Sequence, residues 1–321
     1  MRRLTWGLIG TGDIVNKRVG PALRDLDSCH LHAVARSRSD LAESSARELG
    51  ASKGYSTWQQ LIHDPDIEAV YIATPVYLHA EMTMAAAAAG KHVLCEKPMA
   101  MNPSECDKMI EECKKYNVKL GIAYYRHFYP VLNRVKTVIA SGAIGEIVYM
   151  QMNAFDYFDP EPAHPRYWLL QREKSGGGPM FDFGCHRIEM FLNLLGRVKT
   201  VKGFCSNVLF SREVEDTATA LFYFDSGTHG VLSITHAAAE PQDTVAVFGS
   251  KGSMFVPVLN NGTITFKTSK GEFIENHPPP ANFHQPLIED FVHAVIEDRE
   301  PKVNGATGRE VNRLLMEIYK N

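Results

Sequence analysis

The sequence lacks the features that mark a membrane, secreted or nucleic-acid-binding protein. No apolar run reaches the ~20 residues that a membrane-spanning helix needs. The apolar stretch after Met1-Arg2-Arg3 stops at Gly10, too early for the core of a signal peptide, so we expect none. Basic residues are in no excess, because 34 Lys and Arg stand against 37 Asp and Glu. This balance argues against nucleic acid or an anionic membrane as a partner.

Cysteine is sparse and forms no recognisable pattern. The six cysteines include no CxxC pair, and Cys106 and Cys113, which lie on one predicted helix, are expected to be free thiols rather than a metal pair. No segment resembles a zinc or iron site, so we expect no metal. In the absence of a disulfide pattern, the sequence predicts a cytoplasmic protein.

What is present is an ordinary globular composition in a chain long enough for two domains. The protein has 321 residues, of which 45% are hydrophobic and 22% are charged. At ~150 residues per domain this length predicts two domains. A chain of this size buries roughly three quarters of its surface on folding and needs no disulfides.

Short apolar runs alternate with segments of helical period through the first 123 residues. The predicted strands are 4–9, 30–35, 69–73, 92–95 and 118–123. Helix signals lie between them: Thr57-x-x-Gln60 is a capping-box pattern, Gly90 ends an alanine-rich helix and Asn102-Pro103 begins another. This alternation predicts an α/β domain over residues 1–123, with a doubly wound parallel sheet.

From residue 124 onward the pattern changes to that of an α+β domain. Strands dominate residues 201–274, with a hairpin signal at Asn260-Asn261-Gly262. The predicted helices are 130–141, 185–195, 286–297 and 307–319. We therefore expect a second domain over 124–321 with a large, mostly antiparallel, open sheet. Its last helix, 307–319, is long enough to pack back on the first domain.

A glycine-rich turn follows the first predicted strand. Gly10-Thr11-Gly12-Asp13-Ile14 opens a predicted helix, although Val15 stands where a third glycine is common. A tight turn at Gly10, close backbone approach at Gly12 and a helix N-terminus all suit a pyrophosphate. The alternative is a glycine turn without a ligand. The position of the turn in the first βα unit favours a dinucleotide, and hence a Rossmann domain.

The second predicted strand ends in Arg36-Ser37-Arg38, where an NAD site usually carries Asp or Glu. Two guanidinium groups and a hydroxyl suit a 2′-phosphate, so NADP(H) is the preferred cofactor and NAD(H) the alternative. At roughly 1.5–3 kcal/mol per charge-assisted hydrogen bond, one or two such bonds favour NADP about ten-fold to a few hundred-fold. The other interpretation is a pair of solvated arginines.

Four further motifs are spread along the chain. They are Thr74-Pro75-Val76-Tyr77-Leu78-His79, Glu96-Lys97-Pro98, Ser141-Gly142-Ala143-Ile144-Gly145-Glu146, and Gly176-Gly177-Gly178 followed by Asp182-Phe183-Gly184-Cys185-His186. Together they resemble the motifs of the Gfo/Idh/MocA oxidoreductase family. The resemblance covers essentially the whole chain. It implies a Rossmann domain followed by an α/β domain whose open sheet often forms an oligomer interface.

The resemblance also assigns site residues, position by position. It implies that Lys97, Asp182 and His186 form the catalytic group, and that the Lys97–Pro98 peptide bond is cis. Beyond the glycine turn and the arginines, the cofactor-binding residues that it implies are Thr74, Pro75, His79, Glu96 and Lys97.

The chemistry of these residue types agrees with that assignment. Hydride transfer at a carbinol carbon also moves a proton at the oxygen, and histidine titrates near neutral pH. A lysine beside the oxygen polarises the carbonyl, and Asp182 would orient one of the two partners. Each residue has a structural alternative: Lys97 as a solvated lysine, His186 as a satisfied helix-start histidine, and Asp182 as a helix N-terminal carboxylate.

Four residues are predicted to contact the substrate. Arg126 resembles a family position near the sugar, and Glu189 follows His186 by three residues. Tyr157 and Trp168 lie in an irregular, aromatic segment that could close over a sugar; its alternative is a packed surface loop. The alternative for Glu189 is a pairing with Arg187.

These predictions describe an NADP(H)-dependent oxidoreductase that moves hydride between nicotinamide and a secondary alcohol or carbonyl of a sugar, inositol, sugar acid or related small polyol. Two alternatives share the fold. A regulatory dinucleotide sensor tends to lose the lysine and histidine, which this chain keeps. An NAD-dependent glycosidase has little need of Arg36 and Arg38.

An open sheet with an apolar face also predicts a homodimer or homotetramer formed through the C-terminal sheet.

Overall fold

The computed structural model describes residues 2–36, 38 and 41–320. The chain divides into two compact units. Unit 1 comprises residues 1–125 and 281–312, and unit 2 comprises residues 126–280 and 313–321. The C-terminal helix α10 (Gly305–Ile318) contributes residues to both.

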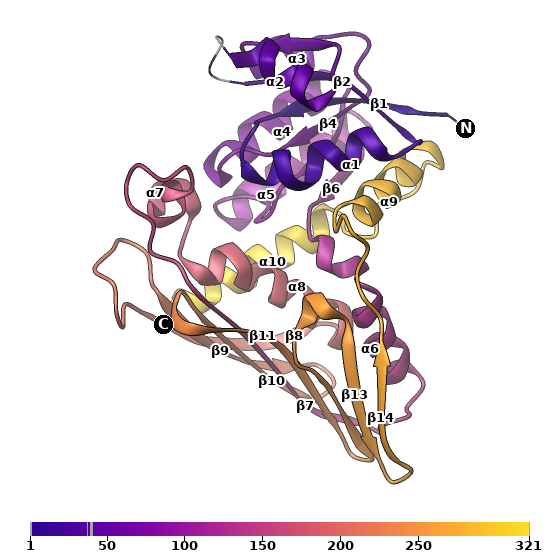
Figure 1. The fold of residues 1–321 in the computed structure, drawn as a ribbon, viewed down its shortest axis with the longest axis vertical. Helices are drawn as coiled ribbons and strands as arrows, with labels where there is room; N and C mark the ends of the chain where they lie inside the picture. The colour runs from indigo at the N-terminus through magenta and orange to yellow at the C-terminus, as the bar shows by residue number, and fades with distance from the viewer. Residues whose placement is uncertain (1, 37, 39–40, 321) are drawn as a thin grey trace. The chain divides into compact units, whose positions relative to one another are not determined.

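Unit 1 is built on a parallel six-stranded sheet (Figure 1). Its strands are β1 (Leu4–Ile9), β2 (Cys29–Ala35), β3 (Lys53–Tyr55), β4 (Ala69–Ile72), β5 (His92–Cys95) and β6 (Leu120–Ile122). Their order is β3-β2-β1-β4-β5-β6. The order reverses between β1 and β4, which is the point where doubly wound sheets bind ligands. The predicted Rossmann fold is confirmed.

Helices connect the consecutive parallel strands of unit 1. They are α1 (Gly20–Asp25), α2 (Ala42–Leu49), α3 (Trp58–Ile62), α4 (His79–Ala88) and α5 (Pro103–Lys115). A further helix of this unit, α9 (Gln285–Ile296), follows the second sheet in the chain. Crossovers run outward from β1 in one direction and from β4 in the other, so right-handed connections place helices on both faces of the sheet. The caps predicted from sequence form: the Asn102 side chain accepts from Glu105 N at 3.0 Å, and Thr57 accepts from Gln60 N at 3.3 Å.

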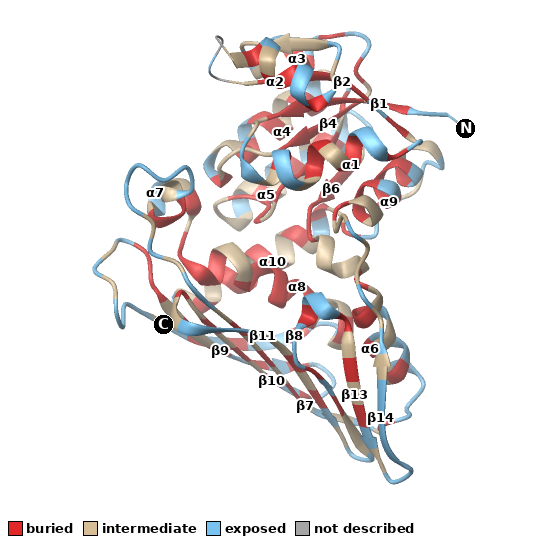
Figure 2. Cartoon of the chain, in the orientation of Figure 1, coloured by how far each residue is buried: buried red, intermediate tan, exposed pale blue. Residues whose placement is uncertain are grey.

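The core of unit 1 joins segments far apart in the sequence. Trp6 on β1 is fully buried, and its ring centroid lies 5.5 Å from that of Phe291 on α9. Figure 2 shows buried residues concentrated along the strands. The buried runs on β1 and β4 are continuous rather than alternating, as expected of strands covered on both faces.

Unit 2 contains an eight-stranded sheet in the order β14-β13-β12-β11-β7-β10-β9-β8. Its strands are β7 (Ile147–Tyr157), β8 (Val198–Ser206), β9 (Thr217–Phe224), β10 (His229–Thr235), β11 (Ala237–Gly249), β12 (Gly252–Val256), β13 (Thr263–Thr268) and β14 (Gly271–Asn276). Every neighbouring pair is antiparallel except β7 and β10, which are parallel. The predicted mostly antiparallel sheet is confirmed.

Helices cover one face of this sheet. They include α6 (Pro130–Ala140) and α8 (Cys185–Leu195); the short α7 (Arg172–Ser175) lies between these two in the chain, in the irregular segment. Phe191 of α8 packs on Phe222 and Phe224 of β9, with ring centroids 4.9 and 5.7 Å apart. β9 therefore alternates buried and exposed residues along its length.

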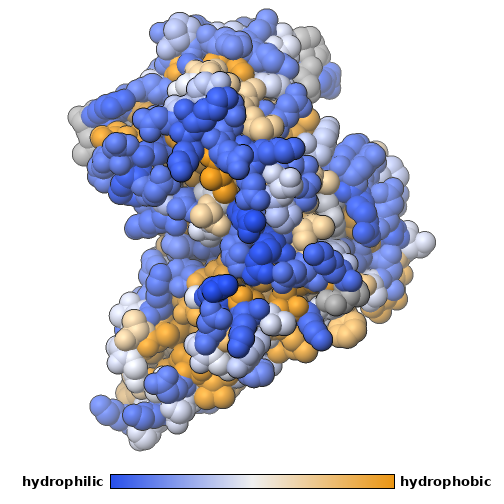
Figure 3. All heavy atoms as spheres, turned by 180° about the vertical axis from the view of Figure 1, so that it is seen from behind, coloured by the Kyte–Doolittle hydropathy of each residue, from blue (hydrophilic) through white to orange (hydrophobic). Residues whose placement is uncertain are grey.

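The other face of the eight-stranded sheet is open and partly apolar. Phe204 is 75% exposed, Ile274 70% and Leu221 53%. Figure 3 shows apolar side chains gathered over these strands. Such a patch on a stable protein is typical of an interaction surface. Among the described residues, no helix is both long and apolar enough to cross a bilayer.

Candidate active site

The glycine turn lies at the carboxyl edge of the unit 1 sheet, directly after β1. Gly10 adopts a φ of +100°, and a Cβ there would lie 2.5 Å from the carbonyl oxygen of Ala73 after β4. Side-chain-bearing residues rarely take this conformation, so glycine is required both for the turn and for the close approach of the two loops.

The surroundings of Gly12 are open, unlike those of Gly10. A Cβ at Gly12 would find no described atom within 4 Å, so the backbone there is open. The helical segment that leads into α1 starts at Asp13, and its first N–H groups have no acceptor within the helix. Thr11 and Ile14 are half-buried beside the opening, and Asp13 pairs with Lys17 at 2.8 Å. An open glycine at a helix N-terminus fits a dinucleotide pyrophosphate.

The arginines after β2 differ in their surroundings. Arg36 is half-buried and donates from Nη1 to the Ser45 hydroxyl of α2 at 2.9 Å. Arg38 is exposed. Ser37, which the sequence also assigns to the cofactor, lies outside the described residues. Because a guanidinium carries five donors, the bond to Ser45 leaves the Arg36 fork able to bind an anion.

His79 ties two loops of this edge together. Its ring is buried, with Nδ1 2.9 Å from the Pro98 carbonyl and Nε2 2.9 Å from the Thr74 carbonyl. Burial lowers the pKa of His79 despite these two carbonyls. The residue predicted to bind cofactor therefore also joins the loop after β4, which carries Thr74 and Pro75, to the segment that carries Lys97.

Lys97 follows β5 and is half-buried at the same edge. The preceding carboxylate, Glu96, is buried and accepts from the Tyr71 hydroxyl at 2.8 Å and from the Lys97 amide at 3.2 Å. Burial raises the pKa of Glu96, but His284, Lys97 and Tyr71 outweigh it and hold that pKa below its ordinary value. A fixed anion thus precedes the Lys97 ammonium, and the Lys97–Pro98 bond is cis as the resemblance implies.

In unit 2, Asp182 and His186 lie on consecutive helical segments. Asp182 is in the π-helical turn η6 (Met180–Gly184), and His186 is in the first turn of α8, 2% exposed. A buried carboxylate, Glu215, accepts from the amides of Gly178 and Met180 at 2.9 and 3.2 Å and from the Tyr319 hydroxyl. These bonds anchor the start of η6, and with it the position of Asp182.

Two basic side chains surround Asp182. Arg166 approaches its carboxylate at 3.6 Å. His236 lies 5.0 Å from Phe183, between ring centroids, and burial lowers the pKa of His236 to about 4. His236 is therefore neutral at pH 7, and Arg166 is a charged neighbour of Asp182.

Two arginines lie beside Asp243 of β11, in a partly buried group of charges. Arg187 of α8 donates to one Asp243 oxygen, and Arg126 approaches the other at 3.8 Å. Arg187 is therefore paired with Asp243 rather than with Glu189, the alternative considered from the sequence. The sequence does not reveal that Asp243 belongs to this group of charges, because its position depends on the pairing of β11 with β7.

Glu189 instead contacts His127. Its Oε1 lies 2.7 Å from Nδ1 of His127, and its side chain is 1% exposed. The other oxygen, Oε2, is buried and has no hydrogen-bond partner among the described residues. His127 is a second participant that sequence reasoning missed, although it directly follows Arg126.

The two aromatic candidates lie apart along the chain. Tyr157 ends β7, is 59% exposed and makes an edge contact with Phe210, with ring centroids 5.5 Å apart. Trp168 is half-buried in the 3₁₀ turn η5 (Tyr167–Leu170). Neither position by itself distinguishes a sugar platform from a packed loop.

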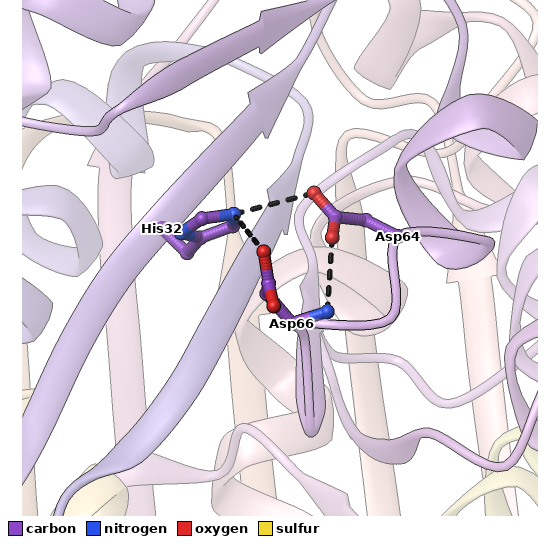
Figure 4. Close-up of side chains that lie close together, drawn as sticks. All are labelled: His32, Asp64 and Asp66. Carbon is purple, nitrogen blue, oxygen red and sulfur yellow. Dashed lines mark hydrogen bonds and ion pairs between the residues drawn. The ribbon is translucent and has the colours of Figure 1, made fainter.

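One cluster in unit 1 has metal-ligand chemistry (Figure 4). His32 Nε2 lies 3.3 Å from one oxygen of Asp64 and 3.7 Å from one oxygen of Asp66. The Lys53 ammonium lies 3.0 and 3.6 Å from the same two oxygens, and Tyr55 donates to Asp64 at 2.9 Å. A divalent ion would have to displace Lys53, so we interpret the cluster as an ion-pair network.

Comparison with known proteins places the chain in a family. Residues 4–124 match the family model described as an oxidoreductase family with an NAD-binding Rossmann fold, and residues 132–255 match the GFO/IDH/MocA C-terminal domain. The chain belongs to the Gfo/Idh/MocA family. As a member, it is an NAD(P)-dependent oxidoreductase.

Several relatives within the family are similar over most of their length. The trans-1,2-dihydrobenzene-1,2-diol dehydrogenase of Mus musculus is 30% identical over 281 residues, 86% of this chain and 80% of that protein. The myo-inositol 2-dehydrogenase of Thermotoga maritima is 28% identical over 321 residues, 94% and 91% of the two chains. The structure of levoglucosan dehydrogenase in complex with NADH and levoglucosan aligns with a TM-score of 0.90 at 25% identity, covering 99% and 97%.

Proposed function

We propose that this oxidoreductase uses NADP(H) to interconvert a secondary alcohol and a carbonyl on a sugar, inositol, sugar acid or related small polyol. The observation that carries the proposal is the arrangement at one edge of the unit 1 sheet. An open glycine at a helix N-terminus follows β1, and Lys97 follows β5 at the same carboxyl edge. The names of the relatives, which include inositol and levoglucosan dehydrogenases, support the substrate class.

In this proposal three residues handle the proton that accompanies the hydride. Bound nicotinamide supplies the hydride acceptor or donor. Lys97 polarises the substrate oxygen and shares its proton. His186 exchanges that proton as general acid or base, and Asp182 orients it.

A substrate panel tests the proposal. The protein is mixed with NADP⁺ or NADPH and with polyols, aldonates, pyranosides and osones, including myo-inositol, levoglucosan and 1,5-anhydro-D-fructose. Turnover is measured as the change in near-ultraviolet absorbance of the reduced nicotinamide. We expect turnover of at least one member in one direction. Silence across the panel despite tight NADPH binding would reject the function in favour of a sensor, and hydrolysis without an absorbance change would indicate a glycosidase.

Replacing Arg38 by alanine is expected to weaken NADPH binding by about 10- to 100-fold and to leave NADH binding unchanged. The exposed guanidinium would lose a charge-assisted bond to the 2′-phosphate, and such a bond contributes roughly 1.5–3 kcal/mol. Both affinities are measured by nucleotide fluorescence. NADH is tested beside NADPH because the similar levoglucosan dehydrogenase has a structure in complex with NADH. Arg47→Ala, on the exposed side of α2, is the control. Equal losses for the two nucleotides would contradict the 2′-phosphate assignment.

We also propose that the open face of the eight-stranded sheet pairs with a second copy of the chain. Leu221, Val231 and Gln151 are cross-strand neighbours, and the row continues through Ala246 and Phe255. A continuous, partly apolar row across a sheet suits a two-fold interface in which the same patch meets itself.

The double variant Leu221→Lys, Phe255→Lys is expected to convert the oligomer to monomer, because four unpaired ammonium groups would face one another across a two-fold interface. Light scattering after size exclusion gives the mass. Val208→Lys places the same side chain at a residue 72% exposed outside the sheet and should leave the mass unchanged. A monomeric parent protein, or an unchanged mass in the double variant, would contradict this interface.

A further inference from the structure

Unit 2 holds a second histidine joined to the helix that carries His186. His127 lies in the 3₁₀ turn η4 (Tyr125–Phe128), and its Nδ1 is 2.7 Å from Oε1 of Glu189 on α8. The Glu189 side chain is 1% exposed and that of His127 is 18% exposed. This short contact between an imidazole and a buried carboxylate defines a His127–Glu189 dyad.

The contact fixes which ring nitrogen of His127 carries the proton. An ionised carboxylate only accepts hydrogen bonds, so Nδ1 must be the donor. In the neutral ring Nε2 then keeps its lone pair. Nε2 makes no hydrogen bond to any described residue, and it is not among the enclosed polar atoms. A carboxylate that sets the tautomer of a histidine leaves the other nitrogen directed at a ligand.

The dyad lies next to the residues already assigned to the reaction. Glu189 follows His186 by three residues on α8, so the two side chains share one face of the helix. Arg126, a predicted substrate contact, immediately precedes His127. The dyad is therefore within a small molecule's length of His186.

Of the two remaining polar atoms of the dyad, Nε2 of His127 is the one that a ligand can reach. Oε2 of Glu189 is buried and has no donor among the described residues. A buried acceptor left without a partner costs roughly 1–3 kcal/mol, and more when it is charged. The His127 side chain is 18% exposed, so a hydroxyl group of a polyol can approach Nε2 and donate to it.

We propose that the His127–Glu189 dyad recognises a hydroxyl group of the substrate other than the one that reacts, so that the enzyme selects polyols over their deoxy analogues. The inference rests on the proposed function and deepens it. Glu189 sets the tautomer of His127, and Nε2 of His127 accepts from the hydroxyl group.

The variant His127→Asn distinguishes recognition of the substrate by Nε2 from the structural hydrogen bond that Nδ1 donates to Glu189. The asparagine amide replaces Nδ1–H and can still donate to Glu189, but it carries nothing at the position of Nε2. We expect KM for the polyol to rise about 10-fold with kcat little changed, and KM for the matching deoxy analogue to stay the same. His127→Gln, which places a polar group near Nε2, should restore part of the loss. The probe pairs are myo-inositol with a deoxyinositol and D-glucose with 2-deoxy-D-glucose.

The control is another histidine–glutamate pair of unit 2. His277 Nε2 lies 2.7 Å from Glu275, the same separation as in the dyad, but on β14 and the turn after it. His277→Asn should change neither KM. Equal losses of the polyol and the deoxy analogue in His127→Asn would make His127 a purely structural residue and overturn the proposal, as would wild-type kinetics in that variant.

A measurement without turnover keeps the two proposals distinguishable. In ¹⁵N-histidine spectra of the whole protein, the neutral ring of His127 should carry its proton on Nδ1 and not on Nε2, and Glu189→Gln should weaken this preference. Saturation with myo-inositol in the presence of NADP⁺ should shift the Nε2 signal. An Nε2–H tautomer, or an unshifted signal with a substrate that is turned over, would overturn the dyad even where the oxidoreductase activity stands.

Discussion

Replacing Lys97 by methionine is expected to lower kcat by about 10²- to 10⁴-fold, the range typical of a lost general acid or base. Methionine keeps the length and the apolar stem of lysine but carries no proton and no charge. Lys97 is half-buried directly after β5, and the residue before it is the buried Glu96. NADPH affinity should change little, because the glycine turn and the arginines after β2 remain. Initial rates and nucleotide fluorescence give the two quantities.

A surface lysine provides the control for this variant. Lys115 of α5 pairs with Glu112 at 3.0 Å and is 60% exposed, so Lys115→Met should keep both activity and cofactor affinity. Parental activity in Lys97→Met would reject the catalytic assignment. A loss of NADPH binding as large as the loss of turnover would make Lys97 a cofactor-binding residue instead.

The parallel half of the fold follows from the sequence because its signals are local. Each of the five predicted strands is present, with ends shifted by at most two residues. The capping side chains Thr57 and Asn102 act where the sequence places them. β3 (Lys53–Tyr55) was missed, since it is three half-buried residues long and its only partner is β2. A strand of three residues is too short to show the alternation of apolar and polar residues by which strands are predicted.

The topology of the second sheet could not be read in the same way. Hairpin signals predict antiparallel neighbours, and β12 and β13 do pair across the turn at Gly262. β7, however, lies between β10 and β11, parallel to the first and antiparallel to the second, although some 70 residues separate it from β10. Such a pairing depends on the packing of whole elements, which local residue patterns do not encode.

The residues of the site also differ in whether local sequence patterns could place them. The glycine turn and Lys97 could be placed at one sheet edge because parallel strands share their carboxyl ends. Asp243 and His127 could not, because their partners Arg187 and Glu189 lie about 60 residues away and on other elements. The only local signal was the run Arg126-His127, where a second polar side chain follows a predicted substrate contact.

Replacing His186 by asparagine is the second change expected to cost about 10²- to 10⁴-fold in kcat. Asparagine offers hydrogen bonds but cannot take up or release a proton. Because His186 is 2% exposed, the substitution also alters packing on α8, so thermal unfolding is measured beside the kinetics. His293→Asn, at an exposed histidine of α9 that pairs with Glu297, is the control. Full activity in His186→Asn, in a protein that still unfolds cooperatively, would contradict its role.

The double variant Lys97→Met, His186→Asn then tests whether the two residues serve one step. If both act on the same proton, removing either already blocks its transfer, and the double variant should be no slower than the slower single variant by more than a few-fold. Residues that act as a unit are non-additive in this way. If the two residues served separate steps or only held the structure, the losses would multiply. Multiplied losses in a stable protein would therefore separate Lys97 from His186 and leave the shared proton without support.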